Sequence, residues 1–142
     1  MLRSLMLTVA VLFATTTTSC AEPISAILYK NPQCGCCEEY AKYLWENGFN
    51  VTVKPTHNMS LISRENGVPE KLAGCHTMLI GSYVVEGHVP VSAINKLLAN
   101  RPNIKGISLP GMPEGSPGMT GSKTEPFTIF EISDEAKVFA VE

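Results

Sequence analysis

The hydrophobic and polar positions follow two different periods along the first third of the chain, and this change of period predicts a mixed α/β fold. Residues 24–29 form an apolar run bounded by prolines, which predicts a buried strand. Residues 49–54 alternate between apolar and polar side chains and predict a second strand. Between them, apolar side chains recur at helical spacing over residues 38–47, and Gly48 provides a C-terminal stop signal.

Shorter elements follow in the middle of the chain, and their order indicates the fold class. Asn58 precedes one short helical pattern, and Pro90 opens a longer one that Pro102 closes. The expected elements are a helix at 58–66, one further turn at 69–73, a hairpin of strands at 77–80 and 83–86, and a helix between the two prolines. Strand, helix, strand, helix, hairpin, helix is the order of a thioredoxin-like α/β sandwich, in which helices flank a mixed central sheet.

The C-terminal part of the chain has a different character. Residues 106–126 are rich in glycine, proline and methionine, with Pro-Gly-Met at 110–112 and again at 117–119, and this segment predicts a loop. Residues 127–132 and 138–141 predict a terminal β-hairpin. The pattern does not define where that hairpin joins the sheet.

Residues 1–21 have the features of a secretory signal peptide and leave residues 22–142 as a single domain. Arg3 precedes an apolar stretch, and small residues stand before the expected cleavage point. The alternative is a lipoprotein with Cys20 as its lipidated first residue, which is less favoured because Thr17 stands where a bulky aliphatic residue is usual. Both hypotheses predict an exported protein in an oxidising compartment.

The charge balance narrows the possible partners. The chain has 11 Lys and Arg residues against 13 Asp and Glu residues, a formal net charge of −2, so no basic surface is left over for nucleic acid. Hydrophobic residues make up 44% of the chain and charged residues 17%, which suits a packed domain. After the signal, no apolar segment approaches the roughly 18 residues of a membrane span, and we expect a soluble mature chain.

Three cysteines occupy one tetrapeptide, Cys34-Gly35-Cys36-Cys37, between a predicted strand and a predicted helix. At a helix N-terminus, unpaired N–H groups and the helix dipole favour the thiolate, the form that attacks disulfides and binds soft metals. Cys75 lies just before the third predicted strand, where thioredoxin-like folds bring a loop against a Cys-x-x-Cys motif. We therefore expect the four sulfur atoms to converge.

Three kinds of chemistry fit four clustered sulfur atoms. Two structural disulfides are one option, although three sulfurs within one turn would close almost no chain. Zinc suits four thiolates, but the Cys-x-Cys-Cys spacing departs from the usual separated Cys-x-x-Cys pairs. Copper as Cu(I) fits better, because it is soft and accepts two or three thiolates that bridge several ions.

The histidines offer further donors. His76 follows Cys75 directly, and it either joins the ligands or points away from them. His57 and His88 are expected as polar surface residues rather than ligands. Of these two, His88 is the better placed to face the cysteine turn.

The methionines give a weaker signal. Met112 and Met119 lie in the predicted loop, where their thioethers could serve as soft ligands. Side chains packed inward under such a loop are nevertheless the more common arrangement. Met59 and Met78 are expected in the core.

Four separated motifs carry a resemblance to a known family. The motifs are the run 29–37 with its Cys-Gly-Cys-Cys, Gly-Cys-His-Thr at 74–77, Val-Glu-Gly-His-Val-Pro at 85–90, and Ile-Ser-Leu-Pro-Gly-Met-Pro at 107–113. Between about residue 27 and residue 119, the chain resembles the DUF411 family of bacterial exported proteins, whose copper-resistance members are called CopG. The resemblance implies a periplasmic, thioredoxin-like domain linked to copper handling. It also implies a copper site at Cys34, Cys36, Cys37 and Cys75.

The main functional hypothesis is a periplasmic copper-binding protein that contributes to copper resistance. Four thiolates would sequester Cu(I), in one form of the hypothesis as a small multinuclear cluster, with redox cycling as a further step. Free thiols in an oxidising space tend to form disulfides, so a periplasmic thiol reductant is an expected partner, and copper-efflux components are another. On this hypothesis the chain is first of all a metal-binding protein, and whether it also has a copper or thiol redox activity stays open.

Two alternatives stay open. A thiol–disulfide oxidoreductase would use Cys34 as the attacking thiolate and Cys37 as the resolving thiol. Such enzymes usually carry a proline in the loop that faces the motif. In this chain the corresponding segment is Gly-Cys-His-Thr at 74–77, which contains no proline and argues against the oxidoreductase. A structural disulfide module with an interaction role is the third hypothesis.

Overall fold

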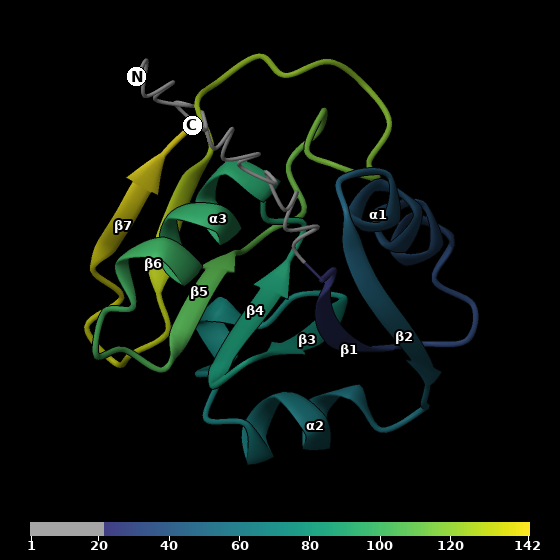
Figure 1. The fold of residues 1–142 in the computed structure, drawn as a ribbon, viewed down its shortest axis with the longest axis horizontal. Coiled ribbons are helices and arrows are strands. Elements are labelled where there is room, and N and C mark those ends of the chain that lie inside the picture. The colour runs from purple at the N-terminus through teal and green to yellow at the C-terminus, as the bar shows by residue number, and fades with distance from the viewer. Residues whose placement is uncertain (1–21) are drawn as a thin grey trace, which may run out of the picture.

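The computed structural model describes residues 22–142, which form a seven-stranded mixed sheet with helices packed on both faces (Figure 1). The proposed signal peptide at 1–21, with Cys20, lies outside the described residues. Within the described part, no helix combines the length and apolar character needed to cross a membrane. The elements are β1 (Ile24–Lys30), α1 (Gly35–Glu46), β2 (Phe49–Pro55), α2 (Met59–Glu65), the 3₁₀ helix η1 (Glu70–Leu72), β3 (His76–Ile80), β4 (Tyr83–Gly87), α3 (Val91–Asn100), β5 (Gly106–Leu109), β6 (Thr128–Glu131) and β7 (Val138–Val141).

The strand order β2-β1-β3-β4-β5-β6-β7 places β2 and β7 at the two edges of the sheet (Figure 1). β1 pairs parallel with β2 and antiparallel with β3, and α1 makes the crossover that a parallel pair requires. β4 pairs antiparallel with β3 and parallel with β5, and the last three strands are antiparallel. The predicted thioredoxin-like α/β sandwich is therefore confirmed.

The two faces of the sheet carry separate apolar clusters, because successive strand residues point to opposite faces. On one face, Leu44 of α1 and Leu97 of α3 pack with Met78 of β3. On the other face, Leu72 of η1 packs with Val84 of β4, and α2 lies against the same side. The central strands are thus buried on both faces of the sheet. Polar functional side chains are therefore expected at the ends of the strands.

The prediction of a loop at 106–126 is wrong for the first four residues, which form the strand β5. This strand pairs with β4 and receives the terminal hairpin through β6, so the hairpin extends the sheet. Sequence analysis missed this strand because it has only four residues and because Gly106 lowers its β-strand propensity. Gly106 is required there, since a Cβ atom at this position would overlap the carbonyl oxygen of Val84.

Two other boundaries differ from the sequence prediction. α1 begins at Gly35 instead of residue 38, which places Cys36 and Cys37 in its first turn and Cys34 at its N-cap. α2 begins after Asn58 as expected, but the Asn58 side chain makes no capping hydrogen bond. The early start of α1 matters for function, because it puts the cysteine motif on the positive end of the helix dipole.

We predict that Gly106→Ala lowers the free energy of unfolding by about 2 kcal/mol, because the new methyl group forces β5 away from β4. Urea unfolding measures this change. Gly35→Ala is the matched control, since no atom lies within 4 Å of a Cβ at Gly35. Equal stability of the Gly106→Ala and wild-type proteins would contradict the tight β4–β5 packing.

Candidate metal centre

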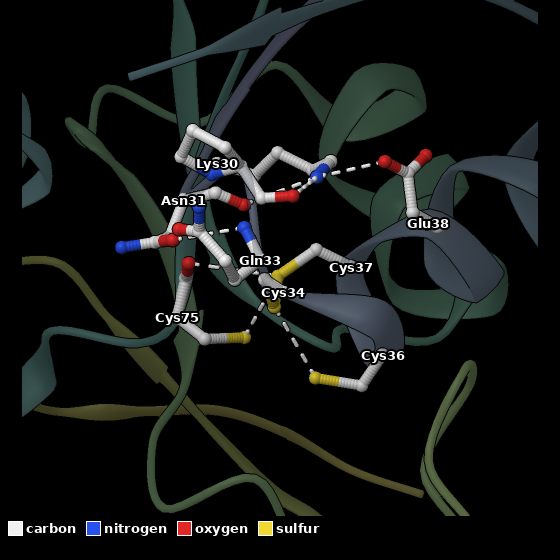
Figure 2. Close-up of polar contacts among 9 residues, drawn as sticks. Lys30, Asn31, Gln33, Cys34, Cys36, Cys37, Glu38 and Cys75 are labelled. Carbon is white, nitrogen blue, oxygen red and sulfur yellow. Dashed lines mark hydrogen bonds and ion pairs between the residues drawn. A yellow bond between two sulfur atoms is a disulfide. The ribbon is translucent and has the colours of Figure 1, made fainter. Parts of the chain in front are cut away.

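The site lies where the end of β1 meets the start of β3. In their antiparallel register Lys30 lies opposite His76, so the turn that leaves β1 and the loop that enters β3 are neighbours. The turn is tight, because the Cys34 N–H donates a hydrogen bond of 3.0 Å to the carbonyl oxygen of Asn31. Cys75 immediately precedes β3 and faces this turn (Figure 2).

The four predicted cysteines come together, with a disulfide at their centre. Cys34 and Cys37 are bonded to each other, while Cys36 and Cys75 are free thiols. The Cys36 sulfur lies 3.4 Å from that of Cys34, and the Cys75 sulfur lies 3.4 Å from that of Cys37 (Figure 2). All four sulfur atoms lie within 4.8 Å of one another. Two disulfides among these four cysteines, one of the sequence-based options, are not what this part of the chain forms.

His88 is buried beside the sulfur cluster, so the expectation that it is a polar surface residue is wrong. Its Nδ1–H donates a hydrogen bond of 2.7 Å to the carbonyl oxygen of Pro117. The other nitrogen, Nε2, then carries the lone pair, and it lies 3.0 Å from the Cys75 sulfur. Its burial depends on Tyr40 and on the Pro117 carbonyl, both distant in the sequence, so the residues next to His88 gave no signal of it. His57 is exposed, as expected.

His76 is also buried and points toward the sulfurs. Its Nδ1 lies 3.5 Å from the Cys75 sulfur, and its Nε2 has no hydrogen-bond partner. Tyr40 stacks on the His76 ring at a centroid distance of 4.5 Å and meets the His88 ring edge-on at 5.2 Å. The Tyr40 hydroxyl donates to the carbonyl oxygen of Val89. Sequence analysis missed Tyr40, because its spacing on the helix marks it only as a core residue.

Burial sets the protonation of the site. It lowers the pKa of His76 to about 3, with the neighbouring His88 ring as a second cause, and it also lowers the pKa of His88. Both rings are therefore neutral near pH 7 and have a lone pair to offer. Burial and the adjacent Cys36 raise the pKa of the Cys75 thiol to about 12. Cys75 thus keeps its proton until a cation displaces it.

An ion pair between a buried lysine and an exposed glutamate supports the cysteine turn. The Lys30 ammonium lies 2.8 Å from a carboxylate oxygen of Glu38 and donates a hydrogen bond of 3.0 Å to the carbonyl oxygen of Asn31 (Figure 2). Lys30 is fully buried, so its ammonium group depends on the Asn31 carbonyl and on the Glu38 carboxylate, which itself remains exposed to solvent. The pair joins β1 to the first turn of α1 and keeps the turn between them in place.

The Cys75 loop is held from the opposite face of the sheet. The Gly74 N–H donates a hydrogen bond of 2.8 Å to the buried Glu86 carboxyl, and the Ser108 hydroxyl donates one of 2.7 Å to the Leu72 carbonyl. Burial raises the pKa of Glu86. Gly74 leaves no room for a side chain, because a Cβ there would lie 2.9 Å from the Cα of Gly87. These contacts position Cys75 without touching its sulfur.

The loop between β5 and β6 extends to α1 (Figure 1). A Cβ at Gly118 would lie 2.6 Å from the Tyr40 backbone nitrogen and 2.8 Å from the Cys36 carbonyl oxygen, so the loop packs directly on α1. Met119 is half-buried next to this contact. Met112 is 40% exposed, and the expectation that it packs inward is wrong. Its backbone has a φ of +46°, which turns the chain at the surface.

The other two methionines differ in burial. Met78 is fully buried in the core, as expected, while Met59 is only half-buried at the start of α2.

Comparisons with known proteins agree with this geometry. The family model described as "Protein of unknown function, DUF411" matches residues 72–119. A solved structure named "Copper resistance protein copG, Form 1" is 37% identical, with a TM-score of 0.77, and the match covers 85% of this chain and 98% of that chain. The Form 2 structure of the same name is 36% identical, with a TM-score of 0.75 and coverage of 84% and 96%. None of the curated proteins compared with the chain matches it.

The fold and the site define a class of protein: a thioredoxin-like domain with a cysteine cluster at the N-terminus of its first helix. Within that class, the chain belongs to the DUF411 family, together with the CopG copper resistance proteins. The family resemblance seen in the sequence motifs is confirmed.

We predict that acid destabilises the metal-free protein through His76. Its pKa is about 3 in the folded protein against an ordinary 6.5, so the unfolded chain binds the proton first and stability falls as the pH drops below 6.5. The loss approaches about 1.4 kcal/mol per pH unit. His76→Phe keeps the stacking on Tyr40 and should flatten this decline, which urea unfolding between about pH 7 and about pH 4 measures.

The comparison between variants isolates His76, because the raised pKa of Glu86 acts in the opposite direction and is common to both proteins. His57→Gln, at an exposed position, is the control and should follow the wild type. Parallel curves for His76→Phe and the wild type would show that His76 does not contribute.

Proposed function

We propose that this chain is an exported copper-binding protein that sequesters Cu(I) at Cys34, Cys36, Cys37 and Cys75 and contributes to copper resistance. The observation that supports this most directly is the cluster of four sulfur atoms, all within 4.8 Å of one another. Ligands this close suit thiolates that bridge several soft ions, and the related structures are named copper resistance proteins. Zinc, which prefers four separate ligands around one ion, fits this crowding less well.

Reduction of the disulfide is the step that completes this donor set. The Cys34–Cys37 bond takes two electrons and two protons and becomes two thiols, and the electrons come from an external dithiol that is itself oxidised to a disulfide. Cu(I) then displaces protons from the four thiols. A reducing partner with two thiols is therefore part of the proposal, and copper-efflux components are candidate recipients of the metal.

The remaining candidate donors lie around this set. His76 and His88 contact the Cys75 sulfur, and Met119 lies on the loop that packs on α1. We assign the exposed Met112 no ligand role. The proposal includes a periplasmic location for residues 22–142 as one domain after removal of the signal, and a change of copper oxidation state as a further step.

A thiol–disulfide oxidoreductase is the second candidate function. The Cys34–Cys37 disulfide at a helix N-terminus favours it, with Cys34 half-exposed to an incoming thiol and Cys37 buried behind it. Dithiol exchange through this pair gives Cys36 no necessary part. Cys36 is accordingly the residue that separates the two functions.

We predict that Cys36→Ser lowers both the number of Cu(I) ions bound by the reduced protein and their affinity, because one bridging sulfur is lost. Anaerobic titration against a Cu(I) chelator measures the binding. Met112→Leu, at an exposed position outside the cluster, is the control and should bind like the wild type.

An oxidoreductase would behave differently in the same variants. Cys36→Ser would keep full disulfide-reductase activity on insulin, while Cys34→Ser would lose it. Full Cu(I) binding by Cys36→Ser, together with reductase activity that depends on Cys34, would replace the copper proposal with the alternative.

A further inference from the structure

A free thiol lies against each sulfur atom of the disulfide. The Cys36 sulfur is 3.4 Å from the Cys34 sulfur, and the Cys75 sulfur is 3.4 Å from the Cys37 sulfur (Figure 2). A thiolate that attacks one sulfur of a disulfide forms a new disulfide with it and releases the other sulfur. The pairing of Cys34 with Cys37 is therefore open to exchange from inside the site.

The surroundings of the two free thiols favour Cys36 as the attacking group. Cys36 is half-exposed and lies in the first turn of α1, where unpaired backbone N–H groups and the helix dipole favour the thiolate. Cys75 lies in the loop that leads into β3, and burial raises the pKa of its thiol, which keeps it protonated. Exchange is therefore expected at the Cys34 end of the disulfide.

The sulfur that leaves in such an exchange is that of Cys37, and it has partners in the Cys75 loop. Cys37 is fully buried, with its sulfur 3.4 Å from the Cys75 sulfur and 3.6 Å from the Cys75 carbonyl oxygen. The Cys75 thiol donates a hydrogen bond to the departing thiolate, and the carbonyl oxygen accepts one from Cys37 once it is protonated. The buried side of the site is thus equipped to hold Cys37 as a free thiol.

We infer that Cys36 exchanges into the disulfide, so that the protein has a second disulfide form with a bond between Cys34 and Cys36 and with Cys37 as a free thiol. The Cys36 thiol loses its proton and attacks the Cys34 sulfur. The new S–S bond forms as the Cys34–Cys37 bond breaks, and Cys37 takes up a proton. Because one disulfide replaces another, no external oxidant or reductant is consumed.

Two features of the cysteine turn allow this step. Attack in line with the bond that breaks requires the Cys36 side chain to rotate, and its half-exposed position leaves room for that rotation. The new disulfide closes a small ring that contains Gly35. Glycine has the backbone freedom that such a ring needs, and no atom lies within 4 Å of a Cβ position at Gly35 to hold the backbone in place.

The exchange moves the disulfide from a partly buried to an exposed position. Cys37 is buried, whereas Cys34 and Cys36 are half-exposed, so the second form offers both of its disulfide sulfurs to the thiol of a partner. The inference rests on the disulfide form alone and does not require copper. Reductase turnover through Cys34 and Cys37 does not require it either, so the activity expected of Cys36→Ser in the oxidoreductase alternative is unchanged.

The experiment maps the disulfide in the exported chain, purified without reductant and freed of metal by a chelator. Free thiols are labelled in acid with light N-ethylmaleimide, because acid protonates thiolates and stops exchange. The disulfide is then reduced, its cysteines are labelled with the deuterated reagent, and fragmentation mass spectrometry reads the label at each cysteine. We expect deuterated label at Cys34 in every chain, and at Cys36 in place of Cys37 in at least about 1% of chains.

Cys36→Ser is the matched control, because it removes the attacking thiol and leaves the Cys34–Cys37 disulfide intact. Its Cys37 should carry the deuterated label throughout, and circular dichroism establishes that the variant is folded. Wild-type chains with deuterated label only at Cys34 and Cys37, at neutral and at alkaline pH, would overturn the inference. Deuterated label at Cys75 with light label at Cys34 would place the exchange at the other end of the disulfide and overturn it as well.

This inference and the Cu(I) proposal fail in different experiments. The mapping contains no copper, so a disulfide fixed between Cys34 and Cys37 would leave Cu(I) binding by the reduced protein untouched. A reduced protein that does not bind Cu(I) would overturn the four-cysteine copper site and leave the exchange untouched.

Discussion

The antiparallel pairing of β1 with β3 is the constraint on which the site depends. Its register sets Lys30 opposite His76, so backbone hydrogen bonds within the sheet determine how closely the cysteine turn and the Cys75 loop approach. A slip of one residue would turn His76 to the other face and move Cys75 with it. The sulfur cluster is therefore held together by the sheet, and the disulfide within it joins only residues of one turn.

The sequence alone was enough to predict the fold class and the approach of Cys75 to the other cysteines. The periodicity of the hydrophobic residues and the glycines and prolines between them identify most elements. The position of Cys75 just before a strand follows from the order of those elements. β5 was missed because four residues that begin with glycine give almost no periodic signal, and its strand identity depends on β4 and β6. Such a strand is defined by its neighbours more than by its own residues.

The histidines show why the composition of the site was harder to predict. His88 stands in a short segment after β4, and nothing local distinguishes a buried ring from an exposed one. Its burial results from Tyr40 of α1 and from the Pro117 carbonyl, both distant in the sequence. The pairing of Cys34 with Cys37 was equally open, since four cysteines allow three connectivities and spacing alone does not select one.

Cys75 connects the chemistry of two groups of donor atoms, the four sulfur atoms and the set of Cys37, Cys75, His76 and His88. Among residues 22–142, it is the one cysteine from outside the turn, and it contacts both the disulfide and the two buried rings. A cation bound with the imidazoles would occupy the Cys75 thiolate and remove it from the all-sulfur group. Reduction of Cys34–Cys37 would in turn add two thiolates on the other side of Cys75 and draw a soft ion away from nitrogen. Because a single sulfur belongs to both groups, any metal bound there would be thermodynamically linked to the state of the disulfide, and a change in either would shift the other.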